Sequence, residues 1–118
     1  MIIAIPVDDD KKSVCVAFGR TPLFLVCNTE TGEQSFLPNP GAEAQGGAGM
    51  KAAQCVVDAE ADVLITKRCG ENAAEVMKAA EIQIFKSAYE FADDNISAFK
   101  AGKLEELTSF HGGYIGIL

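Results

Sequence analysis

The chain lacks the cysteine spacing of a zinc ribbon or a thioredoxin, because no two of its four cysteines are separated by only two residues. It has no apolar run near the roughly 18 residues of a membrane span. No basic region precedes the apolar N-terminus, so we expect neither a membrane helix nor a signal peptide. Positive charge is scarce: 10 Lys and Arg stand against 17 Asp and Glu, for a formal net charge of −7. This balance disfavours nucleic acids and anionic membranes as partners, and we expect a cytoplasmic protein with reduced thiols.

What the chain does have is a hydrophobic content of 48% and 11 glycines in 118 residues, which is typical of one α/β domain spanning residues 1–118. Two glycine-punctuated segments, 45–50 and 66–73, each open a stretch with helical periodicity. A helix start presents unpaired amides and a positive dipole end, so each segment is a candidate anion site. In the second segment Cys69 follows Lys67 and Arg68, which predicts a thiol with a lowered pKa.

The first third of the chain predicts an antiparallel meander. Apolar and alternating runs indicate strands at 2–7, 13–18, 23–28 and 34–37. In the second of these, Val14, Val16 and Phe18 should share one face. Gly32 supplies the positive φ of a hairpin turn before the fourth strand.

The rest of the chain alternates helices and strands, which implies parallel strands joined by right-handed crossovers. Helices are expected at 48–59, 71–80 and 89–100, and strands at 62–66 and 82–85. Gly102 is expected to end the last helix, with a turn at 103–107.

Six short motifs occur in a set order along the chain. They are IAIP at 3–6, FGRTPLF at 18–24, NP at 39–40, GGAG at 46–49, GENA at 70–73 and FKAGKL at 99–104. In these motifs the whole chain resembles the dinitrogenase iron-molybdenum cofactor biosynthesis family, which includes NifX- and NifY-like proteins and the C-terminal domain of NifB-type proteins. The resemblance implies a ribonuclease H-like three-layer α/β fold with a mixed five-stranded sheet. It also implies non-catalytic binding or carriage of an anionic metal–sulfur cluster, such as the iron-molybdenum cofactor or a related Fe–S cluster, received from or passed to a donor or acceptor protein.

The expected cluster site is the rim formed by the 18–20 turn, the 46–49 loop and the 69–72 helix start. Its predicted binding residues are Arg20, Gly46, Gly47, Gly49, Cys69, Gly70 and Asn72. The helix N-termini and the cations Arg20, Lys67 or Arg68 are expected to balance the negative charge of the cluster. Many relatives have histidine at the positions of Ala17 and Gln45, so this chain would need other metal ligands. The thiols of Cys69 and Cys15 and the single imidazole, His111, are the predicted metal ligands.

Each of these interpretations has a plainer alternative. Cys69 and Cys15 could be small buried apolar residues, His111 a solvated side chain, and the glycine loop a simple connection. An interaction or regulatory module with a vestigial pocket, assembled through the apolar segment 112–118, is a second function class. A Mg²⁺-dependent nuclease that uses Asp8 is a third. We expect a monomer or a weak homodimer.

Overall fold

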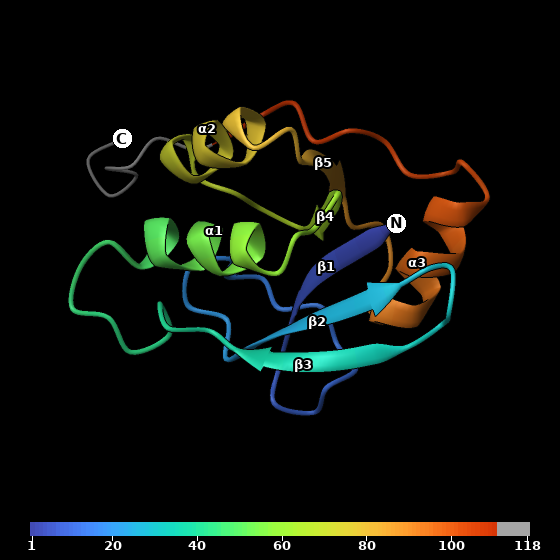
Figure 1. The fold of residues 1–118 in the computed structure, drawn as a ribbon, viewed down its shortest axis with the longest axis horizontal. Helices are drawn as coiled ribbons and strands as arrows, with labels where there is room; N and C mark the ends of the chain where they lie inside the picture. Colours follow the sequence, from blue (N-terminus) through green and yellow to red (C-terminus); the bar gives the residue numbers. More distant parts are fainter. Residues whose placement is uncertain (111–118) are drawn as a thin grey trace.

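The computed structural model describes residues 1–110 of the chain and gives an α/β fold with one mixed sheet and helices on both of its faces (Figure 1). The elements in chain order are β1 (Ile2–Val7), β2 (Leu23–Asn28), β3 (Gln34–Pro38), α1 (Ala48–Asp58), β4 (Val63–Thr66), α2 (Glu71–Ala79), β5 (Gln83–Lys86) and α3 (Ala92–Lys100). The strand order is β3-β2-β1-β4-β5. The first three strands pair antiparallel, whereas β1, β4 and β5 run parallel. The predicted mixed five-stranded sheet is therefore confirmed.

Strand β1 is the centre of the sheet, and its alternating side chains divide the core into two layers. Ile3, Ile5 and Val7 face one side, where they pack in a cluster with residues of α3. Ala4 faces the other side and joins the cluster beneath α1 and α2. All four side chains are fully buried, which explains why β1 reads as an almost continuous apolar run.

Helices α1 and α2 lie side by side on one face of the sheet, while α3 packs on the other (Figure 1). The pair is lined with small buried residues, Ala52 and Ala53 on α1 and Ala73 and Ala74 on α2. Small side chains let the two helices approach each other closely. Within residues 1–110, no helix is long and apolar enough to cross a membrane.

The predicted strand at 13–18 is wrong. The segment makes only isolated bridges, Val7 with Val14 and Ser13 with Phe91. Val14 and Phe18 are buried as expected, but Val16 is 55% exposed. The segment does reach β1, where the amide of Cys15 donates to the carbonyl of Pro6 at 2.9 Å, but it pairs only with the end of that strand. Because β4 pairs with β1 at Ile3 and Ala4 and β2 occupies the other edge, too little of β1 is left for a full strand to pair with.

The predicted start of the last helix is also wrong, because α3 begins at Ala92 and not at residue 89. The side chain of Asn95 holds the preceding turn in a non-helical form. Its Oδ1 accepts hydrogen bonds from the amides of Ala88 and Tyr89, and its Nδ2 donates to the carbonyls of Tyr89 and Phe91. The remaining predicted elements agree with the structure to within one residue at each end.

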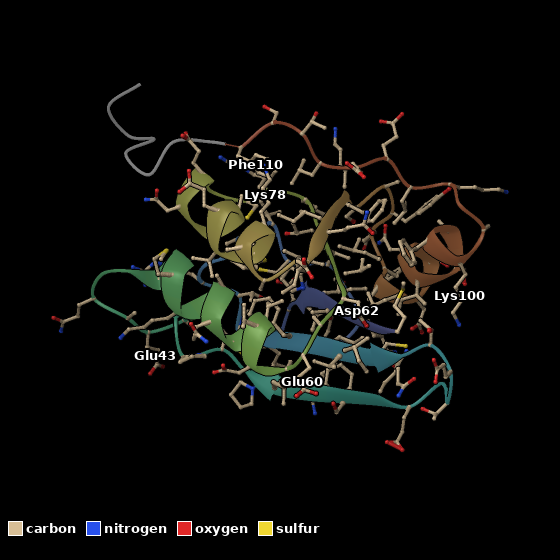
Figure 2. All side chains as sticks on the ribbon, turned by 45° about the horizontal axis from the view of Figure 1, so that its top comes forward. Glu43, Glu60, Asp62, Lys78, Lys100 and Phe110 are labelled. Atoms are coloured by element: carbon tan, nitrogen blue, oxygen red, sulfur yellow. The ribbon has the colours of Figure 1, made fainter. Side chains whose placement is uncertain are left out.

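The turn predicted at 103–107 is wrong, because the segment after α3 runs beside β5 instead. The amide of Leu107 donates to the carbonyl of Ile84 at 2.9 Å. Farther along, Phe110 packs against α2, where the Nζ of Lys78 lies 4.6 Å from its ring centroid (Figure 2). The segment therefore covers the β5 edge of the sheet, and an edge strand left open would be a template for association.

Candidate functional site

A pocket of about 470 Å³ opens where the carboxyl ends of β1 and β4 meet the N-termini of α1 and α2. Ligands in open α/β folds commonly bind in a crevice at the carboxyl ends of the strands. The pocket is lined by Val16, Ala17, Phe18, Gly19, Arg20, Gly47, Ala48, Gly49, Met50, Arg68, Gly70, Asn72 and Ala73. Three segments that are distant in sequence, 16–20, 47–50 and 68–73, therefore share one cavity.

Two glycines bring the first two of these segments into contact. A Cβ on Gly19 would lie 3.1 Å from the amide nitrogen of Gly49. A Cβ on Gly41 would lie 2.5 Å from the carbonyl oxygen of Ala48 and 2.7 Å from that of Gly19. Only a residue without a side chain fits at that distance, so Gly41 sets how closely the start of α1 approaches the 16–20 segment.

Asn39 fixes the same arrangement with hydrogen bonds. Its side chain is buried, and its Nδ2 donates to the carbonyls of Gly19 and Thr21, each at 2.9 Å. Its Oδ1 accepts from the amide of Gly41 at 2.9 Å. The Asn39-Pro40 motif did not by itself predict this role of Asn39. The signal was present in the Asn-Pro-Gly run, because an asparagine side chain readily bonds the backbone two residues on.

The pocket is locally basic although the chain is acidic. Arg20 and Arg68 both line it and both are exposed, and none of the described lining residues is acidic. The Nη1 of Arg20 donates to the carbonyl of Ala44 at 2.8 Å and to that of Ala42 at 3.5 Å. Of the three cations expected to balance the charge of the cluster, Arg20 and Arg68 line the pocket and Lys67 does not.

Both helices at the pocket begin there with unpaired amides. The first intrahelical bond of α1 runs from the Lys51 amide to the Gly47 carbonyl, and that of α2 from the Ala74 amide to the Gly70 carbonyl. The amides before these positions have no acceptor within their helices. Gly47 precedes α1 in a left-handed conformation with φ 68°, and the first turn of α1 contains no acidic residue. The positive end of the α1 dipole is therefore uncompensated by its own helix.

Cys69 does not line the pocket but lies in the core behind it. It is 1% exposed and belongs to the same apolar cluster as Phe18 and Ala73. Its Sγ donates to the carbonyl of Gly70 at 3.5 Å. Burial raises the pKa of the thiol to about 12, despite a smaller opposing effect of Lys78. The predicted lowering of this pKa is wrong, because the loss of solvent around the thiol outweighs the only opposing charge, that of Lys78.

The other predicted site residues divide between the pocket and its surroundings. Gly47, Gly49, Gly70, Asn72 and Arg20 line the pocket together. Gly46 is exposed beside the lining residue Gly47.

The remaining two predicted metal ligands are not among the residues that line the pocket. Cys15 is half-buried, and burial raises the pKa of its thiol. His111 lies outside the described residues. Among residues 1–110, no group of three or more His, Cys, Asp or Glu side chains is arranged to hold a metal ion.

The sequence profile of the dinitrogenase iron-molybdenum cofactor family matches residues 1–102. The chain belongs to this family. An uncharacterised protein of Methanocaldococcus jannaschii is 28% identical to this chain over 109 residues, which cover 90% of this chain and 91% of that protein.

Solved structures agree with this membership. A protein of Thermotoga, named as a candidate NifB protein, is 34% identical with a TM-score of 0.77 over 92% of this chain and 95% of its own. The apo form of the orange protein from Desulfovibrio gigas is 24% identical and superposes with a TM-score of 0.84 over 92% and 93% of the two chains. The latter similarity shows a shared fold. Membership associates the chain with iron-molybdenum cofactor biosynthesis in general.

Proposed function

We propose that this protein binds and carries an anionic metal–sulfur cluster, related to the iron-molybdenum cofactor, in the basic pocket at the N-termini of α1 and α2. The observation that carries the proposal is the concentration of positive charge there. Two guanidinium groups line the cavity together with the start of α1, whose first turn holds no acid, and none of the described lining residues is acidic, in a chain of net charge −7. The start of α2 also lies at the cavity and carries Glu71 in its first turn, so α1 supplies the uncompensated helix dipole. Family members are typically carriers or scaffolds, so we propose binding without catalysis.

In this proposal the protein contacts the outer atoms of the cluster and not its metals. Sulfide and oxide atoms at the surface of an anion accept hydrogen bonds from backbone amides and guanidinium groups. The amides of Gly49 and Met50 at the start of α1, and of Asn72 in α2, are donors of this kind. The absence of side chains at Gly47 and Gly49 leaves the backbone accessible to a bulky anion.

Direct metal bonds are a separate part of the proposal. A thiol bonds metal as the thiolate, and a raised pKa together with burial keeps Cys69 neutral and covered. We therefore propose that Cys69 packs the wall of the pocket and that charge holds the cluster. Cys15 and His111 remain predicted ligands.

The proposed function is tested by metal and sulfide analysis, with visible absorption, on protein isolated without oxygen. We expect bound iron or molybdenum with sulfide, or uptake of supplied tetrathiomolybdate, in the wild type and in Cys69→Ala. Cys55→Ala is the matched control, because Cys55 lies on α1 away from the lining residues of the pocket. A colourless protein that also fails to take up the supplied anion contradicts the proposal. If Cys69→Ala loses binding while Cys55→Ala keeps it, Cys69 is a metal ligand, and the statement that it only packs the wall is wrong.

Other parts of the proposal concern the setting of the site. We propose a cytoplasmic protein, monomeric or weakly dimeric, that exchanges its cargo with a donor or acceptor protein. Val16 and Met50, which are 55% and 46% exposed at the pocket rim, give such a protein an apolar surface to contact. The strand order, with β2 antiparallel to β1, supports the ribonuclease H-like classification that the family resemblance implies.

A further inference from the structure

The two arginines of the pocket are engaged very differently. Arg20 is bound to the backbone, since its Nη1 donates to the carbonyls of Ala44 and Ala42 at 2.8 and 3.5 Å. The guanidinium group of Arg68 makes no hydrogen bond and no ion pair with any residue in the range 1–110. One arginine is therefore already part of the protein's internal hydrogen bonding, and the other presents its donors to the cavity.

The backbone of Arg68, in contrast to its side chain, is held by a hydrogen bond. The hydroxyl of Thr66, which is fully buried at the end of β4, donates to the carbonyl of Arg68 at 3.0 Å. This bond fixes the chain between β4 and α2, so the Arg68 side chain starts from a rigid position. A guanidinium group offers five N–H donors in a planar fork that suits the acceptor atoms of an anion.

Arg20 acts on a segment that leads into the pocket. The amides of Ala42 and Ala44 donate to the carbonyls of Asn39 and Gly41, while their own carbonyls accept from Arg20. The segment 42–44 is thus bonded on both sides, three residues before the left-handed turn at Gly47 that opens α1.

From this contrast we infer that Arg68 is the direct, specificity-determining contact to the anionic cargo, and that Arg20 is a positioning residue that holds the 42–44 segment and, through it, the start of α1. The inference rests on the proposed function, and it gives the two arginines of the same pocket different roles. Of the three cations expected to balance the charge of the cluster, it assigns the direct contact to Arg68, and it moves Arg20 from ligand contact to support.

Two measurements on the full-length protein test the inference. The first is the affinity for tetrathiomolybdate, a small dianion of molybdenum and sulfide, in the wild type, Arg68→Ala, Arg20→Ala and Lys67→Ala. The second is amide hydrogen exchange at Ala42 and Ala44 without any anion. Lys67→Ala is the matched control, because it removes a neighbouring positive charge that does not line the pocket.

We expect Arg68→Ala to weaken binding about tenfold, the size of one lost charge-assisted contact, with exchange at Ala42 and Ala44 unchanged. Lys67→Ala should change the affinity less than twofold. Arg20→Ala should speed exchange at Ala42 and Ala44 severalfold, and Arg20→Lys should do so as well, since an ammonium group cannot reproduce the planar fork.

Three results overturn the inference. They are wild-type affinity in Arg68→Ala, equal losses in Arg68→Ala and Lys67→Ala, and unchanged exchange in Arg20→Ala. A wild-type protein that does not bind the anion at all contradicts the proposed function itself, and the role of Arg68 falls with it. In that case the exchange measurement still decides the role of Arg20, so the two failures are distinguishable.

Discussion

Helices α1 and α3 begin in opposite electrostatic settings, although neither has a side-chain cap. The first turn of α3 contains Asp93 and Asp94, whose carboxylates compensate the positive end of the helix dipole. The first turn of α1 contains no acidic residue and lies on a pocket with two arginines. The helices α2 and α3 both carry acids in their first turns, so of the three helices only α1 has a positive dipole end that its own sequence leaves uncompensated.

The two helix starts also differ in how they are held. A single buried side chain, Asn95, anchors the chain before α3 through four hydrogen bonds. The start of α1 is held by backbone packing, where Gly41 allows the carbonyls of Ala48 and Gly19 to approach. The first arrangement depends on the hydrogen bonds of one side chain, whereas the second also requires the absence of a side chain at Gly41, in addition to the hydrogen bonds of Asn39.

Asn95→Ala should have the largest effect, lowering the free energy of unfolding by about 3 kcal/mol, because it leaves buried backbone groups near α3 without partners. Urea denaturation followed by circular dichroism measures the change. Binding of tetrathiomolybdate by the folded fraction should be unaffected, since α3 lies across the sheet from the pocket. A loss below about 0.5 kcal/mol would show that Asn95 does not anchor the helix.

Gly41→Ala should cost about 2 kcal/mol, because the added methyl group would overlap the carbonyls of Ala48 and Gly19. Unlike Asn95→Ala, Gly41→Ala should also weaken anion binding, because the start of α1 must move away to make room for the added methyl group. Gly46→Ala is the control: its Cβ meets nothing within 4 Å, so stability should change by less than about 0.5 kcal/mol. Equal stabilities of the two variants would refute the close-approach argument.

Met50→Glu converts the start of α1 to the electrostatic setting of α3. The carboxylate should weaken tetrathiomolybdate binding by about two- to fivefold while leaving the helix slightly more stable, since an acid in the first turn is favourable by about 0.3–1 kcal/mol. Met50→Gln, similar in shape but neutral, should bind like the wild type. Equal affinities of Met50→Glu and Met50→Gln for tetrathiomolybdate would show that the charge at the start of α1 does not contribute to binding.

The reverse change, Asp94→Asn, should have the smallest effect. Removing one carboxylate from the first turn of α3 should lower stability by about 0.3–1 kcal/mol at low ionic strength and by less in added salt. Asp94 is preferable to Asp93, whose Oδ1 also accepts a hydrogen bond from Gln34. The expected result is a salt-dependent shift of the urea midpoint with no change in anion binding, and a salt-independent shift would point to another cause.

The sequence predicted most of the fold because most elements are locally consistent. The apolar run at 2–7 and the small-residue helix at 48–59 agree with the structure to within one residue. Gly32 and Gly102 have the positive φ values, 77° and 72°, that their predicted turns require. The failed strand at 13–18 shows the limit of periodicity, since an extended connection can alternate like a strand and yet pair with β1 only at the last residues of that strand.

The candidate site was predicted in outline and not in detail. Glycine patterns and family motifs indicated that segments near residues 20, 47 and 70 belong together, and the structure lines one pocket with them. The direction of the Cys69 side chain could not be inferred, because the two residues before it are cations and only the fold shows that the thiol faces the core. The roles of Asn39 and Arg68 likewise depend on contacts with residues far along the chain or on the shape of the cavity.

The sequence by itself determined the strand and helix pattern, the acidic balance and the glycines at the helix starts, because these follow from local periodicity, charge and backbone freedom. The tertiary structure decided which charges meet and which groups remain in water. It buried Cys69 behind the pocket and thereby raised the pKa of its thiol, and it bonded Arg20 to the backbone while leaving Arg68 at the cavity. Solvation and contact depend on neighbours distant in sequence, and only the folded chain brings those neighbours together.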